Sequence, residues 1–270
     1  MKVYNYSQSD DLKACVLCYP VNFKIINKSS EYYNKIDYDL MYRQYNNFIN
    51  TLSKNSIKLY FIDINKNATQ QVFAQDIGFV IDDVLFISKM KQKERQIETE
   101  SFMSFIKDNN IKYYEMTNNI EGGDVLKYQN VVFVGISSRT TIEAANELQE
   151  SLISMGNNSK VIPINFDASK IHLDCVFNTL DKDSGVISPY VYDRKIIEEH
   201  IKNLYEISKK DADNFGTNYV YLGNRKLISS NKVVSELLEE KGYEVEYVDY
   251  SEIIKSKGSL GCSSMFIERI

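Results

Sequence analysis

The segment DVLKYQNVVFVGIS, residues 124–137, decides how this chain folds. A polar residue opens it, and two apolar, β-branched runs follow on either side of the polar pair QN. Runs of this kind around a short turn are typical of a β-hairpin. The next residues, TTIEAANELQESLISM (140–155), space their apolar side chains by three and four, which predicts a helix. SKVIPINF (159–166) then predicts a further strand, so the unit is β-β-α-β.

This unit recurs along the chain as a weak internal repeat. Similar hairpin segments start at Asp76, Asp124, Asp174 and Asn218, and their separations are 48, 50 and 44 residues. The helices expected after them are 91–109, 140–155, 193–209 and 231–242, and the next strands are 111–116, 159–166, 214–221 and 243–250. Such near-constant spacing predicts four copies of one α/β module.

The two ends of the chain supply a fifth module. ACVLCYPV (14–21) predicts a strand, residues 41–55 a helix and residues 57–64 the next strand. The missing hairpin partner is SMFIERI (264–270), and its pairing with the first strand closes a ring without exposed sheet edges. We therefore expect one α/β domain over residues 1–270, with five ββαβ modules around an axis and the C-terminal strand as the closure. An open α/β sheet without symmetry is the alternative.

The composition argues against several classes of protein. The net charge of −5 disfavours a nucleic-acid binder that neutralises phosphates. No apolar run approaches the roughly 20 residues of a membrane span, and no signal peptide is visible. Four cysteines do not make a disulfide scaffold in a chain of 270 residues. We expect a cytoplasmic protein with reduced thiols, with neither a membrane nor a nucleic acid as partner.

Ionisable residues stand at the starts of the predicted hairpins. The polar residues at these positions are Asp76, Glu121, Asp124, His172, Asp174, Asn218 and Cys262. In a ring of modules, corresponding positions face the same axial mouth. The start of a strand has no structural need for charge in one repeat after another, so these positions are candidates for function.

Only one histidine fits this mouth. His200 lies in the charged helical segment 193–209, where we expect it to face solvent. His172 lies in KIHLDCVF, at the start of a strand pair, and Asp174 would share its face of the strand because side chains alternate. His172 is therefore the candidate acid/base.

Only one cysteine fits the mouth as well. Cys15 and Cys18 lie three apart in a strand, so their thiols face opposite sides and suit neither redox chemistry nor zinc. Cys175 is expected to face away from His172, toward the core. Cys262 follows the small residues GSLG, where backbone N–H groups can approach a reacting centre. A Cys–His pair is a nucleophile with its acid/base partner.

The surrounding carboxylates suggest the charge of the substrate. Buried charges must be paired, so several convergent acids favour a cation. A planar guanidinium binds carboxylates through paired, charge-assisted hydrogen bonds, and its central carbon accepts a thiolate once it is oriented. A metal site formed by His172, Asp174, Glu121 and Asp124 is the competing use of these residues.

At these residues the chain resembles the guanidino-group-modifying enzymes, namely the dimethylarginine dimethylaminohydrolases, arginine deiminases and amidinotransferases. The resemblance covers nearly the whole chain and rests on VFAQDIGFVI, IEGGDVL, FVGISSRTT, IHLDCVF and GSLGCSSMFIERI, in this order. It implies a five-bladed α/β propeller (the pentein fold), closest to the short dimethylarginine dimethylaminohydrolase-like proteins. It also implies a reaction that needs no cofactor and no metal.

The resemblance implies roles for single residues. It makes Cys262 the nucleophile, His172 the general acid/base and Glu121 a further catalytic residue. Asp76, Glu121 and Asp174 would hold the guanidinium. Arg139 in SSRTT, assisted by Arg95, would bind the α-carboxylate of the substrate. Asp124 is a further expected substrate contact, and the alternative for both arginines is a surface ion pair.

The expected activity is hydrolysis of a C–N bond of a guanidino substrate through a thiouronium on the cysteine. The substrate is arginine, a methylated arginine or a related compound, and the products are a ureido compound such as citrulline and ammonia or an amine. An amidinotransferase and a non-catalytic binding protein are the alternatives. Gln75 stands where many relatives carry a basic residue, and Asp174 is more typical of arginine deiminases. The partner is a small molecule, and a homodimer is compatible with the sequence.

Overall fold

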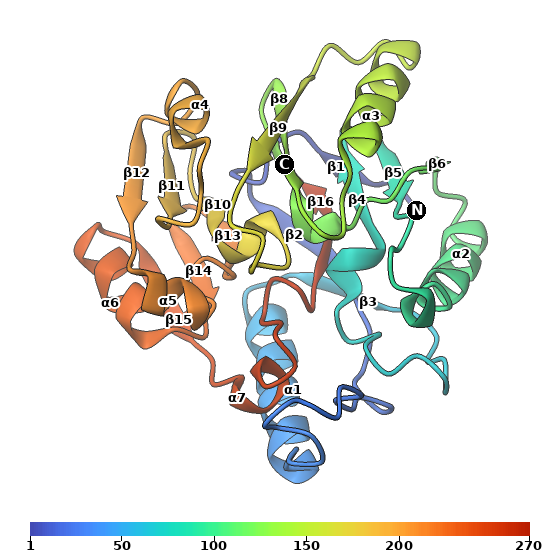
Figure 1. Cartoon of the computed structure of the whole chain (residues 1–270), viewed down its shortest axis with the longest axis vertical. Helices are drawn as coiled ribbons and strands as arrows, with labels where there is room; N and C mark the ends of the chain where they lie inside the picture. The colour runs from blue at the N-terminus through green and yellow to red at the C-terminus, as the bar shows by residue number, and fades with distance from the viewer.

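The computed structural model describes all 270 residues and shows five small β-sheets around a common axis, with helices on the outside (Figure 1). Four sheets have three strands each and one has four. The three-stranded sheets are β4–β5–β6 (Gly78–Ile81, Val84–Ile87, Tyr113–Glu115), β7–β8–β9 (Val125–Tyr128, Val131–Ile136, Lys160–Asn165), β10–β11–β12 (Phe177–Thr179, Ser184–Ile187, Asn203–Glu206) and β13–β14–β15 (Val220–Gly223, Lys226–Ser229, Glu244–Tyr247).

Each of these sheets has the predicted module topology. The first two strands form an antiparallel hairpin, and the third strand pairs parallel with the second. The connection from the second strand to the third carries the helix of the module. The helices in these connections are α1 (Tyr38–Lys54), α2 (Glu98–Asp108), α3 (Ile142–Ser154), α4 (Arg194–Glu198) and α6 (Lys232–Glu240). Two short helices, α5 (Lys209–Asp213) and α7 (Ser251–Ile254), lie between β12 and β13 and between β15 and β16.

Local sequence explains where the longer helices begin. The side chains of Asp37, Thr141 and Asn231 accept hydrogen bonds from backbone N–H groups in the first turns of α1, α3 and α6. These caps satisfy N–H groups that have no partner within a helix. The apolar faces of the helices pack on their sheets and form separate hydrophobic clusters around the ring.

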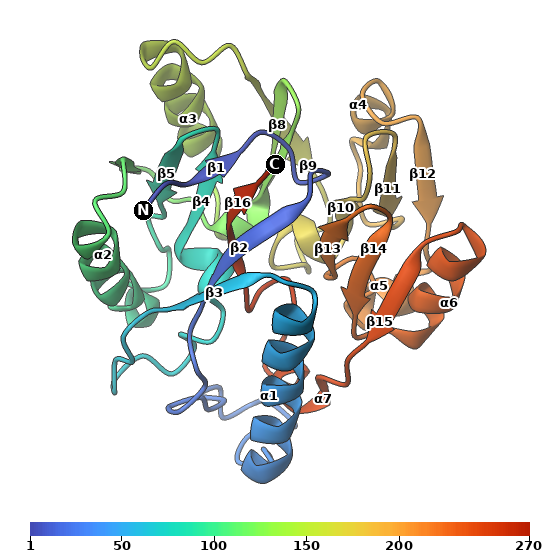
Figure 2. The same cartoon turned by 180° about the vertical axis from the view of Figure 1, so that it is seen from behind.

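The C-terminal strand closes the fold, as predicted. β16 (Met265–Arg269) pairs antiparallel with β2 (Leu12–Leu17), and β3 (Lys58–Phe61) continues this sheet (Figure 2). A short strand that the sequence did not predict, β1 (Tyr4–Asn5), pairs with the other edge of β16. Arg269 is buried and donates to the carbonyl oxygens of Asp10 (2.7 Å), in the loop before β2, and of Tyr221 (3.0 Å), in β13, so it ties the closing strand to the sheet of the adjacent module.

The module that starts at Asp174 departs from the prediction. The expected helix 193–209 is broken into α4 and the strand β12, and α5 follows, whereas the expected strand 214–221 is largely a loop before β13. β12 pairs parallel with β11, so its backbone groups are satisfied by an inter-strand ladder. This tertiary pairing outweighs the helical spacing of the apolar residues. His200 is exposed as expected, although it lies in a turn after α4.

No helix combines the length and the apolar character that crossing a membrane requires.

Candidate active site

One polar residue from each module reaches the axis of the ring. Three of them stand in or next to single 3-10 turns that precede the hairpins, namely η1 (Ala74–Ile77), η3 (Gly122–Asp124) and η4 (Leu173–Cys175). The other two lie in loops before β13 and β16. All five are buried with 3% exposure or less: Asp76, Glu121, His172, Asn218 and Cys262.

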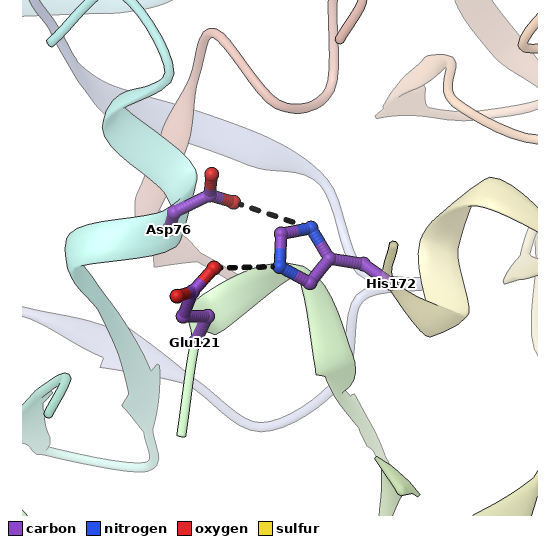
Figure 3. A group of neighbouring side chains, drawn as sticks. All are labelled: Asp76, Glu121 and His172. Atoms are coloured by element: carbon purple, nitrogen blue, oxygen red, sulfur yellow. Dashed lines mark hydrogen bonds and ion pairs between the residues drawn. The ribbon is translucent and has the colours of Figure 1, made fainter. Parts of the chain in front are cut away.

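The imidazole of His172 lies between two carboxylates (Figure 3). Its Nε2 is 2.8 Å from Oε2 of Glu121, and its Nδ1 is 3.6 Å from Oδ1 of Asp76. Burial disfavours the charged ring, but Asp76 and Glu121 outweigh it and raise the pKa of His172 well above its ordinary value. The ring is therefore an imidazolium near neutral pH, with a proton on each nitrogen.

The carboxylate of Glu121 is the most strongly ionised acid of the group. Burial opposes its charge, but the hydrogen bond from His172 and the charges of His172, Arg95 and Arg139 lower its pKa to about 2. Asp76 has one oxygen without such a bond: its Oδ1 is buried and has no hydrogen-bond partner. A buried carboxylate oxygen without a donor is costly, so this atom marks a place for a further cation or N–H group.

Two arginines face the same carboxylates. Nη1 of Arg95 is 2.6 Å from Oδ2 of Asp76, and Nη1 of Arg139 is 3.2 Å from Oε2 of Glu121. Arg95 is buried and donates through Nε and Nη2 to Glu98, which is also fully buried. Neither arginine is a surface ion-pair partner. Glu98 was not predicted, since in KERQIETE it looks like one more charge of a solvated helix.

A pocket of about 520 Å³ lies against the side chains of these two arginines. Its wall includes Arg95 and Arg139, and the loop before Cys262 adds Lys255 and Lys257. Four cations at one mouth, with Glu94 as the acid among the lining residues, suit an anionic group on the outer end of a ligand.

Asp124 lies behind the histidine and supports it. Its Oδ2 accepts from the hydroxyl of Ser137 (2.7 Å), and its Oδ1 accepts from the backbone N–H of Leu173 (2.9 Å), next to His172. Ser137 accepts from the N–H groups of Arg139 and Thr140, so its own hydrogen must go to Asp124. Both carboxylate oxygens are thus used within the protein, and burial raises the pKa of Asp124 to about 6.

Asp174 is buried beside Cys175 and Asn218. Its Oδ2 accepts from Nδ2 of Asn218 (2.7 Å), and the Cys175 thiol donates to its Oδ1 (3.5 Å). Burial raises the pKa of Asp174 to about 7, while the charge of His172 opposes the shift. The carboxyl therefore gains or loses its proton near neutral pH.

Cys175 packs in a hydrophobic cluster, as expected. Residues 173–175 form the 3-10 turn η4 rather than a strand, so the alternation of a strand does not apply to them, and the Cys175 thiol also reaches Oδ1 of Asp174. Cys15 and Cys18 do face opposite sides of β2, since they pack in different hydrophobic clusters.

Cys262 is held through its backbone. Its N–H donates to Oδ1 of Asn218 (3.1 Å), and its carbonyl oxygen accepts from the N–H of Gln75 (3.0 Å). The nucleophile loop is thus bound to the module that carries Asp76 on one side and to the module that carries Asn218 on the other. Gln75, which departs from the expected basic residue, contributes to the site through its main chain.

Glycines let the turns approach one another. A Cβ on Gly122 would lie 2.0 Å from the carbonyl oxygen of Gln75, and one on Gly123 would lie 2.7 Å from Nδ1 of His172. Both contacts are too short for any side chain. The pair GG in EGGD is therefore required by packing between modules rather than by the turn alone.

Asp76, Glu121 and His172 also offer three ligand atoms within 4.8 Å of one another, a spacing that suits a metal ion. However, the two ring nitrogens face different carboxylates, and each carboxylate is already paired with an arginine. The group favours an imidazolium over a metal, because a metal ligand must be a neutral ring. Asp124 and Asp174, two ligands of the metal alternative, are engaged elsewhere.

Comparison with known proteins assigns the chain to a family. The sequence model described as arginine deiminase matches residues 66–206, which is just over half of the chain. The chain belongs to the arginine deiminase family. This range contains the segments with Asp76, Glu121 and His172, and Cys262 lies beyond it.

Relatives of this arginine deiminase family member extend over nearly its whole length. It is 31% identical to the uncharacterized protein YkgA of Bacillus subtilis over 94% of this chain and 91% of that protein. It is 22% identical to a dimethylarginine dimethylaminohydrolase of Streptomyces coelicolor over 87% and 89% of the two chains.

A solved structure confirms the fold. The N-terminal domain of ArgZ, a cyanobacterial arginine dihydrolase crystallised as a C264S mutant with substrate, superposes with a TM-score of 0.85. It is 21% identical and covers 95% of this chain and 98% of that one. The family and this likeness place the chain in the guanidino-group-modifying superfamily with its five-bladed α/β propeller fold.

Proposed function

We propose that this arginine deiminase family member hydrolyses a C–N bond of a guanidino substrate through a covalent intermediate on Cys262. The products are a ureido compound and ammonia or an amine. The observation that carries the proposal is the unpartnered Oδ1 of Asp76, buried beside the His172 imidazolium. The nearest donor to this oxygen, Nδ1 of His172, lies 3.6 Å away, and a guanidinium would give it an N–H group at hydrogen-bond distance.

The substrate would extend from the axial residues to the pocket lined by Arg95, Arg139, Lys255 and Lys257. Its guanidinium pairs with Asp76 and Glu121, while Arg139, assisted by Arg95, binds its α-carboxylate at the pocket of about 520 Å³. In the structure Arg139 pairs with Glu121. Binding therefore exchanges this internal ion pair for the two ion pairs of the substrate.

The reaction uses one nucleophile and one proton carrier. The Cys262 thiol gives up its proton to solvent, and the thiolate attacks the guanidinium carbon. The His172 imidazolium gives its proton to the departing nitrogen, which leaves as ammonia or an amine, and an S-alkylthiouronium remains. Neutral His172 then takes a proton from water, and the water oxygen attacks the thiouronium carbon. Breakage of the C–S bond releases the ureido product and restores the thiolate.

Asp174 favours arginine over dimethylated arginine as the substrate. Its carboxyl is one more buried acid near His172, whose charge opposes the rise in the pKa of Asp174. An unmethylated guanidinium has N–H donors on all its nitrogens, whereas a dimethylated nitrogen carries none. Methyl groups against buried carboxylates would leave acceptors unsatisfied.

A substrate panel tests this function. We expect arginine to yield citrulline and ammonia with no amine acceptor added, measured by a colorimetric ureido assay and by ammonia release. Dimethylarginine should be slower, and agmatine, which lacks the carboxylate, should lose about 10²-fold in kcat/KM. Product that forms only with an added amine would identify an amidinotransferase, and no turnover of any guanidine would support the non-catalytic alternative.

Gly123→Ala tests the packing of the histidine. The new methyl group would overlap the His172 ring, so we expect kcat to fall by about 10- to 100-fold. The melting temperature should fall as well, because the buried ring is held between two carboxylates and has little room to move. Gly156→Ala is the matched control: nothing lies within 4 Å of its Cβ, but its φ of +75° disfavours alanine. That variant should lose about 1 kcal/mol of stability and keep its kcat. An unchanged kcat in Gly123→Ala would contradict the role given to this contact.

A further inference from the structure

Asn218 is the one axial residue without a role in the chemistry above. It lies in the loop before β13 and is 1% exposed, and its amide faces both the nucleophile loop and a carboxyl group. Its Oδ1 accepts from the N–H of Cys262 at 3.1 Å. Its Nδ2 donates to Oδ2 of Asp174 at 2.7 Å. One planar group thus joins the residue that attacks and an acid that holds the guanidinium.

The contacts around Asn218 leave its amide little freedom. A Cβ on Gly261 would lie 3.0 Å from Oδ1 and 3.3 Å from Nδ2, so the amide packs flat against this glycine. The carbonyl oxygen of Asn218 accepts from the N–H of Gly261 (3.4 Å), and its own N–H donates to Phe215 (3.0 Å). The hydroxyl of Thr217 donates to the carbonyl oxygen of Asp174 (2.7 Å). Asn218 therefore binds the Cys262 loop through both its main chain and its side chain, and Thr217 adds a second bond to Asp174.

Only a side chain of this size with one acceptor and one donor satisfies both bonds. An ionised aspartate has the acceptor but no donor, and an apolar residue has neither. Either change removes a donor from a buried oxygen of Asp174, and an apolar residue also removes the acceptor of the Cys262 N–H.

We propose that Asn218 is a positioning residue that couples the Cys262 loop to the Asp174 carboxyl, so that the nucleophile and the guanidinium-binding acid keep one relative geometry. The expected effect on kcat rests on the proposed function. The restraint of the Cys262 loop does not, because it can be measured without a substrate.

Asn218→Asp is the informative variant, because protonation restores what the substitution removes. Near pH 8 two carboxylates face each other, the donor is absent, and we expect kcat to be about 10²-fold below that of the native protein. A shared proton replaces the missing donor as the pH falls, since one carboxyl of a close pair has a raised pKa. The ratio of variant to native kcat should therefore rise toward one between about pH 8 and pH 6.

A second measurement needs no substrate. Cys262 is 3% exposed, and its loop opens more often when Asn218 no longer holds it. We expect iodoacetamide to alkylate Cys262 faster in Asn218→Ala and Asn218→Asp, followed by peptide mass spectrometry. For Asn218→Asp, the ratio of variant to native alkylation rates should return toward one at low pH.

Asn178→Asp is the matched control. Asn178 donates to the carbonyl oxygen of Thr217 (3.0 Å) but makes no hydrogen bond to Cys262 or Asp174. The ratios of kcat and of alkylation rate between this variant and the native protein should therefore not depend on pH. Ratios for Asn218→Asp that stay flat across this range would overturn the proposal. If no guanidine is turned over, the proposed function fails, and the alkylation ratios alone still decide whether Asn218 holds the loop.

Discussion

We expect Cys262→Ser to lower kcat by about 10⁴-fold or more while the protein stays folded. A hydroxyl is far less acidic than a thiol, so a bound cation cannot convert it to the attacking anion near neutral pH. The substitution changes one buried atom, and the loop keeps its backbone bonds to Asn218 and Gln75. Steady-state ureido production measures the loss, and circular dichroism checks the fold.

Two further observations make this test specific. Intact-mass spectrometry of the native protein, quenched during turnover, should show an adduct on Cys262 that the serine variant lacks. Cys18→Ser is the control, since Cys18 is equally buried but packs in the cluster between β2 and α2. Retention of native turnover by Cys262→Ser would rule out the covalent mechanism.

Glu121→Gln is the second large effect, with an expected fall in kcat/KM of about 10³-fold. The glutamine keeps the shape of the side chain but removes the charge that holds both His172 and, on binding, the substrate cation. The imidazolium of His172 then loses a stabilising neighbour, so the pKa of His172 falls relative to the native protein. Above that pKa the general acid is deprotonated, and the alkaline limb of the pH–rate profile should move to lower pH.

The pH–rate profile separates this role from simple destabilisation. Glu246→Gln removes a carboxylate on β15 that binds Asn55 and Lys226 and is not one of the axial residues. It should lower stability slightly and leave the position of both limbs unchanged. A Glu121→Gln profile with an unshifted alkaline limb would show that Glu121 does not set the protonation of His172.

The axial residues were predictable because their positions repeat. Asp76, Glu121, His172 and Cys262 each precede a hairpin, and the hairpin pattern depends on alternation and turn residues that are local in sequence. The structure brings Asp76, Glu121 and His172 into one buried group, and the backbone of Cys262 binds that of Gln75, next to Asp76. Asn218 shares that position and was visible in the repeat, but an amide gives no signal of chemistry by itself.

Other parts of the site depend on contacts that no local pattern contains. Glu98 looks like a solvated helix residue in sequence and is the buried partner of Arg95 in the structure. A 3-10 turn at residues 173–175 replaces part of an expected strand and brings the Cys175 thiol to Oδ1 of Asp174. β12 replaces part of an expected helix because β11 offers it a parallel partner.

The sequence by itself determined the five-module architecture, its closure by the last strand, and the residue types at the axis. These follow from hydrophobic periodicity, turn chemistry and spacing, which act over a few residues. Only the tertiary structure decided the charge of His172, the pairing of Arg95 and Arg139, and the junction of Asn218 with Cys262 and Asp174. Protonation and ion pairing depend on burial and on distances of a few ångströms between modules, and the folded chain alone sets both.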